Sequence, residues 1–218
     1  KACGSIQARD KGQEIHSHIE KRGILGIEPN VGNTLVDMYA KCGELHKARG
    51  VFEELPVQNV VSWVALMSGY AQIGQAEIVL ELYTKMKREG LDPNLVTFLV
   101  LINACSHGGL LDKGPYYFDI MSNEYGFVPT LEHHTCMIDL LARTGNLYEA
   151  AKYLESTPSP PSIETWRALL YACKLYGETE LGSRCFHHLA QIDSEFAALA
   201  DGYSGSEAWD NVSAMDGY

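Results

Sequence analysis

One short pattern returns along the chain and constrains its fold more than any other feature. Each copy ends in a glycine, and these glycines share one phase: Gly43, Gly74, Gly109, Gly145 and Gly177, with gaps of 31, 35, 36 and 32 residues. Five residues later the side chain is mostly small, in the row Ala48, Val79, Gly114, Ala150 and Gly182. This period is typical of tandem two-helix units, so we expect stacked copies of one hairpin.

Apolar residues recur at helical spacing on both sides of the glycines. Leu35 and Tyr39 precede one glycine, and Leu82 and Met86 follow the next. The glycine is expected to end the first helix, because it adopts positive φ without steric cost. A proline-containing turn closes the second helix of most units. The predicted fold class is therefore all-α, an α-solenoid of helix-turn-helix repeats that bury their apolar faces by stacking.

These signals divide the chain into consecutive units. The predicted boundaries are about 1–28, 29–59, 60–94, 95–130, 131–162 and 163–196, with 197–218 as a partial unit or a frayed tail. The chain begins at Lys1 with no methionine and no targeting segment, so we expect it to be part of a longer protein. An exposed end unit could pair two copies, which predicts a possible homodimer.

Charge and composition exclude some classes of protein. Hydrophobic residues make up 46% of the chain, but no apolar run approaches the ~20 residues that a membrane span requires, so no membrane partner is expected. The formal net charge is −11. Residues 1–94 hold 11 basic and 12 acidic residues, whereas residues 95–218 hold 6 and 16. Attraction to phosphate is therefore expected to be weak, above all toward the C-terminus.

The sequence offers no convincing catalytic motif, metal site or cofactor site. The six cysteines form no CxxC pair. His18 and Glu20 match the HxE half of a zinc deaminase signature, but they lie within an expected second helix and lack the cysteine half. The histidine pairs 133–134 and 187–188 are adjacent and point to different helix faces. We therefore expect no enzymatic activity, no metal and no cofactor in this chain.

Particular sequence segments resemble one class of two-helix repeat. Tetratricopeptide repeats, which bind peptides, have a similar length but lack these phrases. The segments 33–43, 60–63 with 68–70, and 102–110 closely resemble plant pentatricopeptide repeats. The alternating unit lengths resemble the PLS subclass of that family. Residues 165–173 followed by 180–182 resemble the first E motif that follows the array in that subclass.

The resemblance implies a single-stranded RNA partner, read at one base per repeat. Members of this subclass are mostly organellar factors that place one cytidine for C-to-U editing, so the implied location is the mitochondrion or the chloroplast. Because this chain lacks a deaminase motif, a deaminase or an editing accessory protein would be recruited in trans through the E-like region. Two alternatives stay open: a protein-interaction scaffold, and a factor in organellar RNA splicing or stability.

In the family, the fifth and last residues of each repeat face the base. Carried onto this chain, the candidate pairs are Asn33 with Asn59, Val64 with Asn94, Leu99 with Thr130, and Thr135 with Ser162. The paired amides resemble the pyrimidine-reading combination, and the hydroxyl pair is nearer the purine-reading types. Val64 and Leu99 cannot hydrogen-bond, so selection at those units should be weak. Arg167 and Phe196 of the E-like unit match no reading combination and are expected to pack.

The second residue of each repeat flanks the base as an apolar wedge in the family. Val61 and Val96 match that role, whereas Glu132 does not. Asparagine and threonine at a helix start are also common N-caps, so capping is the competing interpretation for the last residues. The case for reading depends on their recurrence at one phase.

Overall fold

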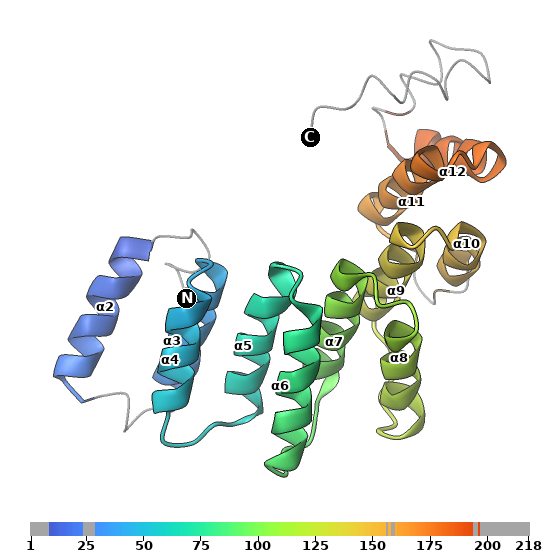
Figure 1. Cartoon of the computed structure of the whole chain (residues 1–218). Helices are drawn as coiled ribbons and strands as arrows, with labels where there is room; N and C mark the ends of the chain where they lie inside the picture. The colour runs from blue at the N-terminus through green and yellow to red at the C-terminus, as the bar shows by residue number, and fades with distance from the viewer. Residues whose placement is uncertain (1–8, 24–28, 156, 158–159, 194–195, 197–218) are drawn as a thin grey trace. The chain divides into compact units, whose positions relative to one another are not determined.

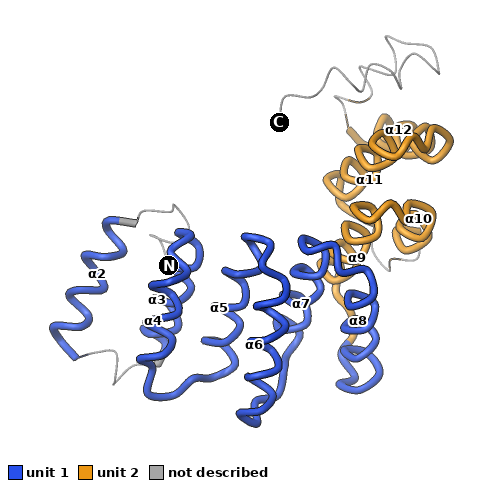
Figure 2. The backbone as a smooth tube through the Cα atoms, in the orientation of Figure 1, with its two compact units in different colours: residues 1–127 blue, residues 128–218 orange. Residues whose placement is uncertain are grey.

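The computed structural model describes residues 9–23, 29–155, 157, 160–193 and 196, and every regular element in those ranges is an α-helix (Figure 1). The all-α class predicted from the repeat is therefore confirmed. The chain divides into two compact units, residues 1–127 (unit 1) and 128–218 (unit 2), shown in Figure 2. The predicted tail 197–218 lies outside the described residues.

The helices come in consecutive pairs. Unit 1 contains α2 (Arg9–Lys21), then α3 (Pro29–Lys41) with α4 (Leu45–Glu54), α5 (Val60–Gln72) with α6 (Ala76–Arg88), and α7 (Leu95–Gly108) with α8 (Lys113–Asn123). Unit 2 contains α9 (Leu131–Arg143) with α10 (Leu147–Glu155), and α11 (Ile163–Tyr176) with α12 (Thr179–Ile192). The first helix of each pair begins at residue 29, 60, 95, 131 or 163, where the sequence places the start of a unit.

The glycines at the shared phase form the turn between the two helices of each pair. Their φ angles are 75° at Gly43, 74° at Gly74, 64° at Gly109, 78° at Gly145 and 76° at Gly177. The predicted positive-φ turn is thus confirmed at all five positions. A side chain would be strained in this conformation, so the repeat requires glycine there.

The first helices pack side by side and carry the core. In unit 1, α3 packs on α5 and α5 packs on α7, while each also packs on its own second helix; α9 and α11 do the same in unit 2. Figure 1 shows α3, α5 and α7 following one another through unit 1. Val36, Leu66 and Leu101 are fully buried in unit 1, and Leu140 and Leu169 are fully buried in unit 2.

Close approach of neighbouring helices depends on small side chains. Ala48 and Ala150, five residues after the turn glycines, are fully buried. Gly69 of α5 lies against Ala40 of α3, where a Cβ atom would stand 2.7 Å from the Ala40 Cβ atom. Small residues therefore occur where neighbouring helices approach each other closely. Among the residues described, each helix is too short or too polar to cross a membrane.

Candidate nucleic-acid interface

Four positions of each first helix form one face, because residues 2, 5, 9 and 13 are three or four apart. We call this face the stripe of that helix. It comprises Asn30, Asn33, Asp37 and Lys41 on α3; Val61, Val64, Ser68 and Gln72 on α5; Val96, Leu99, Asn103 and His107 on α7; Glu132, Thr135, Asp139 and Arg143 on α9; and Glu164, Arg167, Tyr171 and Leu175 on α11. Every second and thirteenth residue in this set is exposed. The stripes therefore line an accessible surface in each unit.

The structure brings the first predicted pair together. The Asn33 side-chain Nδ2 donates to Asn59 Oδ1 at 3.3 Å, although the two residues are 26 positions apart. Asn33 is only 6% exposed, and its Oδ1 atom is buried without a hydrogen-bond partner in the described part of the chain. An unpaired buried carbonyl carries a free-energy penalty that a ligand donor would relieve. The pair therefore presents an open acceptor beside the Asn59 amide.

The last residues of the repeats cap the next first helix, as the competing interpretation expected. Asn59 Oδ1 accepts from the backbone amides of Val61 at 2.9 Å and Ser62 at 3.1 Å. Asn94 Oδ1 accepts from the amide of Thr97 at 2.9 Å in a reciprocal capping box. Capping occupies the amide oxygens and leaves the Nδ2 atoms of both asparagines out of the cap. Capping and base reading are therefore compatible, because they use different atoms of one side chain.

The remaining candidates are placed differently. Val64 and Leu99 are half-buried, and because their side chains are apolar, neither adds a polar group to the surface. Thr135 is half-buried on α9, and Ser162 caps α11 by accepting from the Thr165 amide at 3.2 Å. Leu99 lies in unit 1 and Thr130 lies in unit 2.

The predicted wedges are exposed. Val61 retains 58% and Val96 retains 52% of its accessible surface, at the same position on neighbouring helices. Exposed valines at this register have no core to fill, and their apolar surface is free to contact a ligand. Both residues thus occupy accessible positions on the stripes of unit 1.

At the start of α9 the same positions carry a polar network. The Thr130 hydroxyl donates to Glu132 Oε2 at 2.6 Å and lies 2.8 Å from the Nδ1 atom of the buried His133. The bond from Thr130 holds the pKa of the Glu132 carboxyl below its usual value, with a smaller contribution from its own backbone amide. Glu132 is therefore ionised at neutral pH, which is unfavourable next to phosphate.

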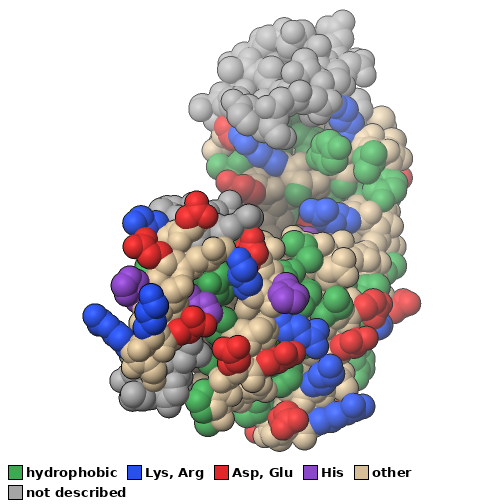
Figure 3. Space-filling model, turned by 60° about the vertical axis from the view of Figure 1, so that its left-hand side comes forward, with side chains coloured by type: hydrophobic (Ala, Val, Ile, Leu, Met, Phe, Trp, Pro, Cys, Tyr) green, Lys and Arg blue, Asp and Glu red, His purple; other side chains and the backbone are tan. Residues whose placement is uncertain are grey.

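On two of the helices, two stripe residues form an ion pair with each other. Lys41 Nζ lies 2.9 Å from Asp37 on α3, and Arg143 Nε lies 2.8 Å from Asp139 on α9. These four positions were not among the candidates predicted from the sequence, although opposite charges four apart in a helix are a readable signal. Acidic and basic side chains are interspersed over the face shown in Figure 3. Lys41 and Arg143 are thus each partly neutralised by an aspartate on the same helix.

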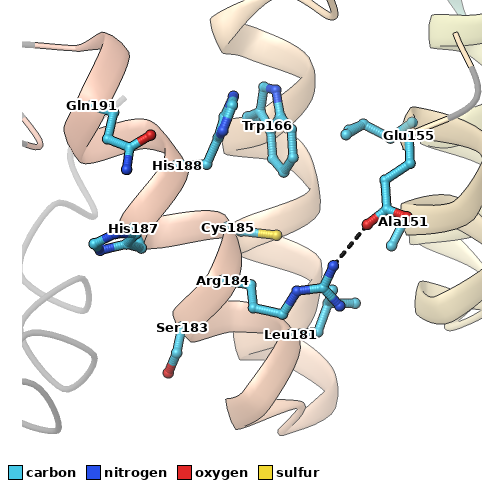
Figure 4. Close-up of a pocket in the computed structure, with 11 residues that line it drawn as sticks. Ala151, Glu155, Trp166, Leu181, Ser183, Arg184, Cys185, His187, His188 and Gln191 are labelled. Carbon is cyan, nitrogen blue, oxygen red and sulfur yellow. Dashed lines mark hydrogen bonds and ion pairs between the residues drawn. The ribbon is translucent and has the colours of Figure 1, made fainter.

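Unit 2 also contains a cavity. It has a volume of about 550 Å³ and is lined from α10, α11 and α12 (Figure 4). Arg184 Nη2 pairs with Glu155 Oε1 at 2.7 Å at its wall, and the Trp166 and His188 rings lie 4.0 Å apart. None of the residues that line it belongs to a stripe.

The histidines, acidic residues and cysteines in the described part of the chain offer no metal site. No group of three or more His, Cys, Asp or Glu side chains there could hold a metal ion. His18 and Glu20 lie on α2. Burial raises the pKa of the Cys105 and Cys136 thiols to about 12, so both are protonated and poorly nucleophilic at neutral pH.

Comparison with known proteins agrees with this architecture. A PPR repeat family model matches residues 58–107, and the PPR repeat model matches 33–60, 96–124 and 132–156, together more than half of the chain. The crystal structure of the pentatricopeptide repeat protein PPR10 from maize aligns over 84% of this chain and 28% of its own, at 21% identity and a TM-score of 0.63. That protein is also solved in complex with an 18-nt psaJ RNA element.

Curated relatives come from Arabidopsis thaliana. The chain is 36% identical over 218 residues to the chloroplastic pentatricopeptide repeat-containing protein DOT4, covering 98% of this chain and 25% of DOT4. It is 38% identical over 215 residues to pentatricopeptide repeat-containing protein At3g29230, covering 97% of this chain and 36% of that protein. The chain thus spans about a quarter to a third of these relatives. The repeat matches and the shared architecture place it in the pentatricopeptide repeat family.

Proposed function

We propose that this chain is a sequence-selective module that binds single-stranded RNA along its stripes. The observation that carries the proposal is the Asn33–Asn59 pair, in which a buried Asn33 oxygen lacks a partner beside an amide donor. The complex of the maize protein with an RNA element supports the same class of ligand. Affinity would come from contacts to base edges more than from phosphate, because each stripe cation already has an acidic partner.

The chemistry of the pair fits a pyrimidine edge. Asn33 Oδ1 can accept from the cytosine amino group or from the uracil N3–H, and Asn59 Nδ2 can donate to the adjoining ring nitrogen or carbonyl oxygen. Val61 on α5 and Val96 on α7 supply exposed apolar surface that can flank bases. At Val64 and Leu99 the fifth position offers no hydrogen bond, so selection along unit 1 should be concentrated at Asn33.

In its finer form, the proposal assigns the chain to an organellar C-to-U editing factor of the PLS subclass, with residues 163–196 as an E-type unit. The unit lengths and the phrases at 165–173 and 180–182 support this assignment. The deaminase would act in trans, and the name of the chloroplastic relative supports an organellar setting. Self-association through the repeat ends stays a prediction that sedimentation velocity would test.

A binding assay tests the RNA proposal directly. Fluorescence anisotropy with single-stranded oligonucleotides that differ at one base should show a pyrimidine preference that Asn33→Asp reduces by about fivefold, because the variant loses the Nδ2 donor that positions Asn33 against Asn59 Oδ1 and places a carboxylate oxygen there instead. Asn123→Asp is a matched control, because Asn123 is exposed at the end of α8 and outside the stripes. If both variants retain the wild-type base preference, the assigned reading residues are wrong.

Editing requires a separate experiment. In a line that lacks the parent protein, sequencing of organellar transcripts should reveal at least one unconverted cytidine. The wild-type gene should restore conversion, and the Asn33→Asp gene should restore it less. Complete editing in the mutant line would remove the editing assignment while leaving RNA binding to the anisotropy assay.

A further inference from the structure

Two cysteines meet inside the α11–α12 pair. Cys173 lies four residues before the turn glycine Gly177, and Cys185 lies eight residues after it. The turn brings these positions together, because the Glu178 amide donates to the Cys173 carbonyl oxygen at 2.8 Å and α12 then packs along α11. Both side chains are fully buried, and the Cys185 thiol donates a hydrogen bond to the Cys173 sulfur. Two free thiols are thus in contact with each other.

The other helix pairs carry different residues at these two positions. Counted from the turn glycine of each pair, the equivalent residues are Tyr39 with Val51, Tyr70 with Leu82, Cys105 with Tyr117, and Leu141 with Tyr153. Each of these combinations includes at least one bulky side chain, as expected where two packed helices face each other. Among the pairs that the structure describes, α11–α12 alone has a cysteine at both positions. The thiol pair is therefore a feature of this unit and is not required by the repeat.

The cavity of unit 2 gives small molecules a route to the pair. Cys185 is one of the residues that line this cavity, and Figure 4 shows its sulfur directed toward α11. The cavity has a volume of about 550 Å³, whereas a water molecule occupies about 30 Å³ in the liquid. The side chains of Arg184 and Glu155 at its wall are about 60% exposed, so the cavity reaches solvent. A small polar oxidant such as hydrogen peroxide can therefore approach the two thiols.

The hydrogen bond between the thiols makes them chemically unequal. It lowers the pKa of the Cys173 thiol, against the opposing effect of burial. The same bond, together with burial, raises the pKa of Cys185. Because the thiolate is the reactive form of cysteine, Cys173 is the thiol that reacts first and Cys185 is the partner that keeps its proton. At Cys105, by contrast, burial raises the pKa of a thiol that lies in unit 1.

We propose that Cys173 and Cys185 form a reversible redox pair, which a peroxide converts into a disulfide that joins α11 to α12. The Cys173 thiolate attacks one peroxide oxygen, so an S–O bond forms, the O–O bond breaks, and the released hydroxide takes up the proton that Cys173 lost. The Cys185 sulfur then attacks the sulfenic sulfur of Cys173. The S–S bond forms, the S–O bond breaks, and the Cys185 proton leaves with the hydroxide as water. The two thiols lose two electrons, which reduce one peroxide to two waters, and an external dithiol reverses the bond by exchange.

Peptide mapping of the whole folded chain tests the proposal, because trypsin separates the two cysteines. Cleavage after Arg167, Lys174 and Arg184 leaves Cys173 in the peptide 168–174 and Cys185 in the peptide 185–218. After treatment with hydrogen peroxide and alkylation of the remaining thiols, mass spectrometry should find these two peptides joined, with a mass two hydrogens below their sum. Treatment with dithiothreitol before alkylation should return both as separate alkylated peptides.

Two variants show whether the link is specific to this pair. Cys185→Ala should abolish the joined peptides. Cys105→Ala is the matched control, because Cys105 is also fully buried but lies in unit 1, and it should retain them at the wild-type yield. Circular dichroism checks that both variants fold.

Three outcomes in the wild type alone would overturn the proposal, so it stays testable even where a variant does not fold. The first is that peroxide oxidises other cysteines and leaves the peptides 168–174 and 185–218 separate. The second is that Cys173 is joined mainly to a cysteine other than Cys185. The third is that the two peptides are joined only after the chain has been unfolded in urea. Because the Asn33→Asp assay tests RNA binding independently, failure here is distinct from failure of the proposed function.

Discussion

The stripes of α5 and α11 lie on helices of the same repeat architecture, but their exposed side chains differ in chemical character. Both helices start after a capping residue and end near a positive-φ glycine. The α5 stripe ends in Ser68 and Gln72, whereas the α11 stripe ends in Tyr171 and Leu175. The comparison teaches that the repeat constrains the turn and the buried contacts, and leaves the exposed stripe free to diverge between units.

The largest effect is expected where the scaffold itself is changed. Gly69→Val should destabilise unit 1 by about 1–3 kcal/mol, because a Cβ atom at position 69 would stand 2.6 Å from Leu45 Cδ2 and 3.3 Å from the Ala40 Cα atom. Thermal unfolding followed by circular dichroism measures the change. Gly50→Ala is the control, since a Cβ atom there meets nothing within 4 Å, and it should stabilise α4 slightly. Equal stability of the two variants would contradict the proposed role of close helix contacts.

Two substitutions at Asn59 can separate its role as a helix cap from its proposed role in base reading. Asn59→Ala should lower stability by about 1 kcal/mol through loss of the α5 cap. Asn59→Asp keeps the acceptor but removes the Nδ2 donor, so stability should be retained while cytosine binding weakens by a factor of about 2 to 10. Chemical denaturation and anisotropy measure the two effects. A loss of RNA affinity in the alanine variant alone would show that the cap, and not the donor, matters for binding.

The salt dependence of RNA affinity measures how much binding along the stripes depends on charge. Each phosphate that a cation neutralises contributes about −0.7 to the slope of log affinity against log salt for single strands. Lys41→Ala should therefore make the slope shallower by about 0.7, and Asp37→Asn should strengthen binding by freeing Lys41 from its ion pair. Anisotropy titrations at several salt concentrations give the slopes. A steep slope that Lys41→Ala leaves unchanged would place the phosphate contacts elsewhere.

The smallest effect is expected at the acidic second position of α9. Because the pKa of Glu132 is lowered in the folded state, its bond with Thr130 adds stability above the usual carboxyl pKa, and this contribution is lost as the pH falls through the folded pKa. An NMR titration should show the pKa of Glu132 rising in Thr130→Val. An unchanged titration curve would mean that the hydroxyl does not hold this carboxylate.

The glycine turns and the starts of the first helices could be predicted from sequence because they depend on local chemistry: glycine at positive φ, and a capping residue before an apolar run. Gly43 and Gly177 show this at the two ends of the row. The Asn33–Asn59 hydrogen bond joins residues 26 positions apart, so periodicity could identify each residue but not the contact. Periodicity likewise could not reveal that Arg167 is held by Asp193, because that pairing depends on where the chain returns after α12.

The proposed double use of Asn59 and Asn94, as helix caps and as base-reading residues, has a consequence for how such a chain can change its target. A residue that must end one repeat and also start the next helix is restricted to the few short polar side chains that satisfy exposed backbone amides, mainly asparagine, aspartate, serine and threonine. The need to cap a helix therefore limits which side chains can be used for recognition at that position, whatever nucleotide is bound. Mutation within this small group can alter specificity and leave the architecture intact.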